Sequence, residues 1–126
     1  MKKGNLTQNG VHLKEHEYAT VRLLLEAGYD VELIPPSKIK GLKMPDIMLS
    51  GVAWEMKSPE GNGRRTLQNT FQTAAHQSNS IIIDLRRCVI PETSAIKELE
   101  KQFKLSKRIR RMKIIKKDEI IVDFTK

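Results

Sequence analysis

The sequence predicts a mixed α/β fold, and three observations lead to that prediction. Apolar residues recur at helical spacing in three stretches, while the shorter apolar runs between them have the alternating or continuous pattern of strands. The chain has 126 residues, which fits one domain with a substantial core. Residues 46–57 read as two strands around a tight turn, and such a hairpin excludes an all-parallel sheet. We therefore predict a single domain, residues 1–126, with the element order α-β-β-β-α-β followed by α-β-β.

The N-terminal part of the chain begins with a polar, turn-rich stretch, residues 1–11, which we expect to be flexible. Residues 13–27 have the pattern of a helix that stops at Gly28, because glycine favours the backbone conformation that ends helices. The alternating stretch 29–34 predicts a strand, and the two prolines that follow end it.

A basic loop, residues 37–44, leads to the hairpin, whose two strands flank Ser50 and Gly51. Beyond it we predict, in order, a flexible basic loop over 58–65, a helix over 66–78, a buried strand over 80–85, a helix over 91–106, and two strands over 112–117 and 119–124. A continuous β-branched run indicates the buried strand, and a proline suited to a first turn indicates the last helix. The final two strands form either a closing hairpin or two sheet edges.

The hairpin brings two acids and a lysine to one face. With Ser50 and Gly51 as its turn, Asp46 lies opposite Glu55, and side chains alternate along each strand. One face is then entirely apolar and consists of Ile47, Leu49, Val52, Trp54 and Met56. The other face carries the two carboxylates, whose Cβ atoms we expect about 4.5–5.5 Å apart, with Lys57 two residues further along.

Directly opposed carboxylates destabilise a strand pair unless something neutralises them. Mg²⁺, or another divalent cation such as Mn²⁺, does so, and Mg²⁺ favours one or two carboxylates with water and substrate phosphate. Asp46 and Glu55 are therefore candidate metal ligands. Lys57 is a candidate catalytic residue, because an ammonium group there orients water or stabilises negative charge on a phosphate. This arrangement indicates hydrolysis of a phosphodiester, and the alternative is a solvated strand face with a Glu–Lys pair.

Glu17 supplies an independent indication on the first predicted helix. At 100° per residue it falls in the middle of the apolar stripe, close to Val21 and Leu24. A carboxylate on a buried stripe is costly unless it is paired or coordinated. Glu17 is thus a candidate third catalytic acid that reaches the metal directly or through water. The alternative is a salt bridge at the N-terminal end of the helix, where the helix dipole also favours an acid.

The charge balance favours a polyanionic partner. Lys and Arg number 23 against 15 Asp and Glu, a formal net charge of +8, which is typical of nucleic-acid-binding proteins. Arg64 and Arg65 precede the second helix and are candidate phosphate contacts. Thr73 and Gln77 lie on a polar ridge of that helix and are candidate phosphate or sugar contacts. Ordinary solvated surface remains the alternative for these four residues.

The remaining composition points to a reducing compartment. The single cysteine, Cys88, cannot form an internal disulfide. No apolar run is long enough for a membrane span, and the basic N-terminus lacks the apolar region of a secretory signal. We therefore expect the protein to act in the cytoplasm.

The acids and the lysine of the predicted hairpin, together with Glu17, resemble the motif of the PD-(D/E)xK nuclease superfamily. The matching elements are Pro45-Asp46, then Glu55-Met56-Lys57, with Glu17 on the preceding helix, and the element order α-β-β-β-α-β matches that superfamily's core. Within it, residues 13–85 look like the C-terminal tRNase toxin domains of contact-dependent growth inhibition proteins. Two longer patterns are similar: E-x-x-x-x-x-x-L-x-x-x-G-x-x-V, which begins at Glu17, and A-x-x-Q-S-x-x-I-I-I-D, which begins at Ala74. The motifs P-D at Asp46 and E-x-K at Glu55 are the third similar part.

The resemblance implies a metal-dependent endonuclease that cleaves tRNA after delivery into a target bacterial cell, with a cognate immunity protein as partner. It places Asp46 and Glu55 on the metal, makes Lys57 catalytic and lets Glu17 complete the acidic cluster. Two alternatives stay open. A DNase has the same site, because most of the superfamily cleaves DNA, and a non-catalytic nucleic-acid-binding module has the same scaffold.

Overall fold

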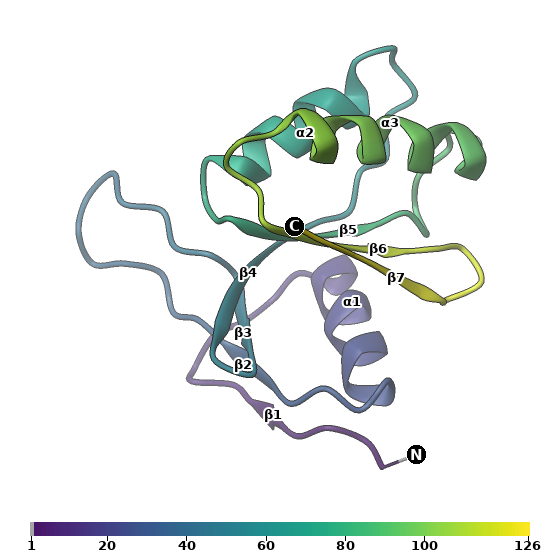
Figure 1. The fold of residues 1–126 in the computed structure, drawn as a ribbon. Helices are drawn as coiled ribbons and strands as arrows, with labels where there is room; N and C mark the ends of the chain where they lie inside the picture. The colour runs from purple at the N-terminus through teal and green to yellow at the C-terminus, as the bar shows by residue number, and fades with distance from the viewer. Residues whose placement is uncertain (1) are drawn as a thin grey trace.

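The computed structural model describes residues 2–126, which form a seven-stranded sheet with helices on both faces (Figure 1). Figure 1 shows α1 below the sheet and α2 and α3 side by side above it. The elements follow the chain as β1 (Leu6–Thr7), α1 (Glu15–Glu26), β2 (Val31–Leu33), β3 (Ile47–Leu49), β4 (Val52–Lys57), α2 (Thr66–Ala75), β5 (Ser80–Asp84), α3 (Glu92–Leu105), β6 (Arg111–Ile115) and β7 (Ile121–Thr125).

The sheet is mixed, as predicted, and its strands lie in the order of the chain from β1 to β7. Strands β2, β3 and β4 pair antiparallel, β4, β5 and β6 pair parallel, and β6 and β7 pair antiparallel. Parallel neighbours need long crossover connections, and α2 and α3 provide those from β4 to β5 and from β5 to β6. The last two strands form the closing hairpin, which confirms one of the two arrangements left open by the sequence.

The N-terminal segment contains a strand that the sequence analysis did not assign. Leu6 and Thr7 pair parallel with Val31 and Glu32 of β2, and the Gly4 N–H donates to the Leu25 carbonyl at 2.8 Å. The described part of residues 1–11 is therefore joined to the sheet edge, whereas we expected a flexible stretch; residue 1 lies outside the described residues. Backbone groups make this pairing, and both strand residues are exposed, so no apolar pattern marks it.

The hairpin has the predicted register. Ile47 lies opposite Trp54 and Leu49 opposite Val52, with Ser50 at φ 48° and Gly51 at φ 80° in the turn. Positive φ at both central residues matches the twist of a two-residue hairpin. A slip of one residue would have moved every side chain to the other face, so this turn decides which residues face the core.

Helix boundaries differ from the predicted ones by a few residues, because turn-like backbone hydrogen bonds replace helical ones near the C-terminal ends. The first helix ends at Glu26 rather than at residue 27, and beyond it the Gly28 N–H bonds the Leu25 carbonyl while Gly28 has a φ of 97°. The second helix ends at Ala75 rather than at residue 78, and the Gln77 and Ser78 N–H groups both bond the Ala74 carbonyl. No helix within residues 2–126 has the length and apolar character that a membrane crossing requires.

The sheet separates two hydrophobic clusters. The cluster under α1 includes Leu24, Ile47, Trp54 and Met56, so the predicted apolar face of the hairpin is confirmed as buried. The cluster under α2 and α3 includes Phe71, Ala74, Ile81, Ile83, Leu99 and Met112. Strand β5 is buried along its whole length, as its continuous β-branched run predicted.

A buried polar group joins α1 to the end of β5. The Asp84 carboxylate is 3% exposed and accepts hydrogen bonds from the Thr20 hydroxyl at 2.6 Å and the Arg86 guanidinium at 2.8 Å. Arg86 also donates to the Ala19 carbonyl of α1. Burial alone would raise the pKa of Asp84, but the hydrogen bonds from Arg86 and Thr20 outweigh it and lower the pKa.

We expect Asp84→Asn to lower the free energy of unfolding by about 3 kcal/mol, because it leaves the Arg86 charge without its buried partner. The stabilisation from the lowered pKa of Asp84 is present above the usual value of 3.8 and is lost as pH falls below it. Urea unfolding at pH 7 and pH 3 measures both effects. Glu119→Gln, which removes only the exposed partner of Arg86, is the control and should cost less than about 1 kcal/mol. Equal costs for the two variants would contradict the prediction.

Candidate active site

Asp46 stands immediately before β3, where backbone bonds fix it from both neighbouring strands. Its N–H donates to the Trp54 carbonyl at 3.1 Å, and its carbonyl accepts from the Ile34 N–H at 3.0 Å. Its side-chain Oδ2 accepts a hydrogen bond from the Met56 N–H at 2.8 Å. The carboxylate is thereby held against β4, where it also interacts with the Glu55 carboxyl group.

Glu55 and Lys57 extend from β4 on the face opposite the apolar one. The Lys57 ammonium lies 3.4 Å from the Glu55 Oε2, and the Glu55 side chain is almost fully buried while that of Lys57 is about one quarter exposed. Glu55 Oε1 is buried and has no hydrogen-bond partner among the described residues. A buried oxygen without a hydrogen bond lowers the stability of the fold. A cation or a hydrogen-bond donor bound next to it would therefore be stabilised.

Burial and the neighbouring charge of Asp46 raise the pKa of Glu55 to about 8, against the opposing effect of Lys57. Burial also raises the pKa of Asp46, although the hydrogen bond from the Met56 N–H opposes that rise. Two adjacent carboxylates therefore share a site in which one lysine does not compensate them fully. The opposed acids that the hairpin register predicted are brought together here.

The residues present fit a divalent cation with few protein ligands. Asp46 and Glu55 supply carboxylate oxygens, and the unpartnered Oε1 is one that a cation satisfies. Within residues 2–126 no group of three or more His, Cys, Asp or Glu side chains is placed to hold a metal ion. Two carboxylates could hold Mg²⁺ or Mn²⁺, which bind one or two carboxylates together with water and phosphate oxygens.

Glu17 lies near this pair but has a role of its own in the helix. It is half-buried, and its Oε1 accepts a hydrogen bond from the Lys14 N–H at 2.8 Å at the start of α1. Its charge contributes to the raised pKa of Asp46, so the two acids are close enough to interact. The structure therefore brings Glu17 towards the site without placing it in a three-acid cluster, and in the described residues it forms no salt bridge.

A cleft of about 280 Å³ opens beside Lys57, between the end of β4 and α2. Its lining consists of Lys57, Ser58, Pro59, Asn69, Thr70 and Thr73. The Arg87 guanidinium donates to the Ser58 carbonyl at 3.0 Å and pairs with Glu60 at 3.1 Å, which anchors that wall. Hydroxyl and amide groups beside an ammonium are suited to contact with a sugar–phosphate backbone.

Of the four predicted nucleic-acid contacts, the structure brings only Thr73 to this cleft. Arg64 and Arg65 are exposed on the loop before α2, where both charges are open to an approaching polyanion, and Arg65 donates to the Gln68 side chain. Gln77 is half-buried beyond the end of α2 and does not line the cleft.

Sequence reasoning placed Asn69 only beside the polar ridge of this helix and missed Thr70, and both line the cleft. Both lie three or four residues from Thr73, so the helical period places them on the same face of α2. That spacing, applied outward from Thr73, is the signal that would have found them.

Residues 43–121, well over half of the chain, match the family described as the contact-dependent growth inhibition CdiA C-terminal domain. The chain belongs to this family, and it is therefore a toxin domain. Its fold is similar to that of the solved CdiA-CT/CdiI toxin and immunity complex from Burkholderia pseudomallei, with a TM-score of 0.71 and 18% identity over 98% of this chain and 100% of that chain. No curated protein is similar enough in sequence to count as a match.

Proposed function

We propose that this toxin domain is a metal-dependent endonuclease of the PD-(D/E)xK superfamily and that its substrate is tRNA. The proposal is supported above all by one arrangement of side chains. Asp46 and Glu55 lie side by side at the open end of the hairpin, and the Lys57 ammonium lies 3.4 Å from Glu55 Oε2. The buried Glu55 Oε1 has no hydrogen-bond partner among the described residues. This set supplies two ligands for a divalent cation and one ammonium group on the same face.

Each residue has a separate role in the proposed reaction. Asp46 and Glu55 would hold a Mg²⁺ or Mn²⁺ ion, which would supply polarisation of the scissile phosphate and activation of water. The hydrogen bond from the Met56 N–H keeps the Asp46 carboxylate in place. Lys57 faces the cleft, where its ammonium orients the attacking water and stabilises the negative charge that develops on the phosphate. Glu17, whose charge acts on Asp46, would be the third acid and would reach the metal directly or through water.

The charge of the chain supports a nucleic-acid substrate. The net charge is +8, and the loop before Asp46 carries three exposed lysines, Lys38, Lys40 and Lys43. Together with Arg64 and Arg65 they flank the site with positive charge that attracts a phosphate backbone. The resemblance to tRNase toxin domains selects tRNA from among nucleic acids.

We also propose that a cognate immunity protein binds this domain and that the domain acts in the cytoplasm of a target cell after delivery. The support is family membership together with the similar fold of a toxin solved as a complex with its immunity protein. The exposed positive charge around the site is suited to an acidic partner surface.

Incubation with total tRNA and with plasmid DNA, each with Mg²⁺ or with EDTA, tests the proposed function. We expect cleavage of tRNA that requires Mg²⁺ and that is slower by about 10²–10³-fold in the Lys57→Ala variant. Cleavage of plasmid DNA but not of tRNA would support the same hydrolysis reaction and show that the substrate is DNA. Failure to cleave either nucleic acid, with retained salt-sensitive binding, would favour a non-catalytic nucleic-acid-binding module.

A further inference from the structure

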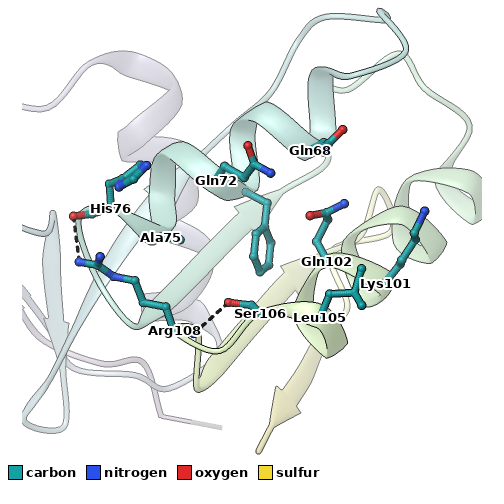
Figure 2. Close-up of a pocket in the computed structure, with 10 residues that line it drawn as sticks. Gln68, Gln72, Ala75, His76, Lys101, Gln102, Leu105, Ser106 and Arg108 are labelled. Carbon is teal, nitrogen blue, oxygen red and sulfur yellow. Dashed lines mark hydrogen bonds between the residues drawn. The ribbon is translucent and has the colours of Figure 1, made fainter.

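A larger groove lies on the other flank of α2, between α2 and α3, and encloses about 540 Å³ (Figure 2). None of Arg64, Arg65, Thr73 and Gln77, the four side chains predicted as nucleic-acid contacts, lines it. Phe71 and Ala75 contribute apolar lining. The amide groups of Gln68, Gln72 and Gln102 stand around the groove, where Gln102 donates to Glu98 and Gln68 accepts from Arg65. The groove is thus both apolar and rich in groups that donate and accept hydrogen bonds.

Positive charge lies at both ends of the groove. Figure 2 shows Arg108 and His76 at one end and Lys101 at the other. Lys101 and Arg108 are exposed, and neither forms a salt bridge in the part of the chain that the structure describes. The lining identified within residues 2–126 contains no aspartate or glutamate, and the nearby Glu98 carboxylate accepts a hydrogen bond from the Gln102 amide at 2.8 Å, so the groove favours an anion at its two ends.

We propose that this groove binds a single-stranded segment of the RNA substrate, outside the catalytic cleft. Glutamine amides form paired hydrogen bonds with base edges, and Lys101 and Arg108 are placed to contact the phosphates on either side of a bound nucleotide. An acidic peptide would also satisfy the two cations, but the groove shares α2 with the cleft beside Lys57, and this proximity favours the substrate as the occupant.

The position of α2 relates the groove to the proposed active site. Thr70 and Thr73 line the cleft beside Lys57, while Gln68 and Gln72 line the groove. A helix with its side chains is about 10–12 Å across, so one strand of RNA that crosses α2 reaches both places. The assignment of RNA as the ligand rests on the proposed function. The assignment of the groove as a binding site depends only on its lining residues and their charge.

The test compares two variants in the Lys57→Ala background, so that binding does not depend on cleavage. The groove variant carries Gln72→Ala, Lys101→Ala and Arg108→Ala, all at exposed positions. The control carries Lys3→Ala and Lys117→Ala, which remove the same charge at exposed positions outside the groove and the cleft. Affinity for a single-stranded RNA is measured over a range of salt concentrations.

We expect the groove variant to bind about 10-fold more weakly than the control and its salt slope to fall by about 1.4, since each lost single-strand phosphate contact accounts for about 0.7. In the cleavage-competent protein, the same substitutions should raise KM for tRNA and leave kcat unchanged. The single charge reversal Lys101→Glu should give the same direction of change with minimal risk to the fold.

Equal affinity and equal salt slope in the groove variant and the control would overturn the proposal. A loss of affinity for an acidic protein partner with no loss for RNA would also overturn it, because the groove would then belong to that partner. If the wild-type protein cleaves no nucleic acid, the proposed function fails, whereas the binding comparison in the Lys57→Ala background still decides the role of the groove.

Discussion

Replacing Lys57 with alanine should lower the rate of tRNA cleavage by about 10²–10³-fold, the usual cost of removing one group that stabilises a developing charge. The ammonium is the only cationic group among the residues that line the cleft beside β4. Its loss leaves the negative charge on the phosphate without a counterpart on that side. Affinity for tRNA should change little, because the exposed lysines and arginines around the site remain.

The fold of this variant should remain intact, because the Lys57 side chain lies on the face of β4 opposite the buried Trp54 and Met56. Single-turnover cleavage and thermal unfolding, measured on the same samples, separate the two effects. Lys117→Ala removes the same charge from an exposed turn position and should cleave at the wild-type rate. Wild-type cleavage by Lys57→Ala would show that Lys57 has no catalytic role.

The second large effect concerns stability in the absence of divalent cations. Between pH 5 and pH 8 in EDTA, the free energy of unfolding should fall by on the order of 2–4 kcal/mol. The cause is Glu55, whose carboxyl has a pKa of about 8 in the folded protein against the usual 4.5. In this range the folded state holds a proton that the unfolded state has lost, so stability decreases as pH rises and levels off above pH 8.

Glu55→Gln removes that titration, so the variant should show a much flatter dependence on pH and be more stable than the wild type at pH 8 in EDTA. Mg²⁺ at 100 times its Kd should restore about 2.7 kcal/mol to the wild type and nothing to Glu55→Gln. Chemical unfolding at pH 5, 7 and 8, with and without Mg²⁺, measures these differences. Glu26→Gln, at an exposed position of α1, is the control and should follow the wild type. A wild-type profile that is flat in EDTA would contradict the raised pKa.

The sequence predicted the hairpin well because local rules determine it. Side-chain alternation and the tight turn at Ser50 and Gly51 together specify which residues face the core and bring Asp46 and Glu55 together. The helices and the buried strand β5 were likewise predicted from their own periodicity. These features depend on residues close together in the chain.

The features that sequence reasoning missed depend on distant residues or on backbone groups alone. Strand β1 pairs with β2 through main-chain bonds between residues about 25 positions apart. The Thr20–Asp84 hydrogen bond joins residues separated by 64 positions. The groove between α2 and α3 exists only once both crossover helices pack side by side on the sheet, and neither helix alone indicates it.

Strand β4 pairs with β3 on one side and β5 on the other, and it carries both Glu55 and Lys57. The groups proposed for chemistry therefore stand on one of the most constrained segments of the backbone. The groups proposed to select the substrate stand on the loop before Asp46 and on the surfaces of α2 and α3. Specificity in such a domain can diverge through surface substitutions while the reaction centre is inherited unchanged.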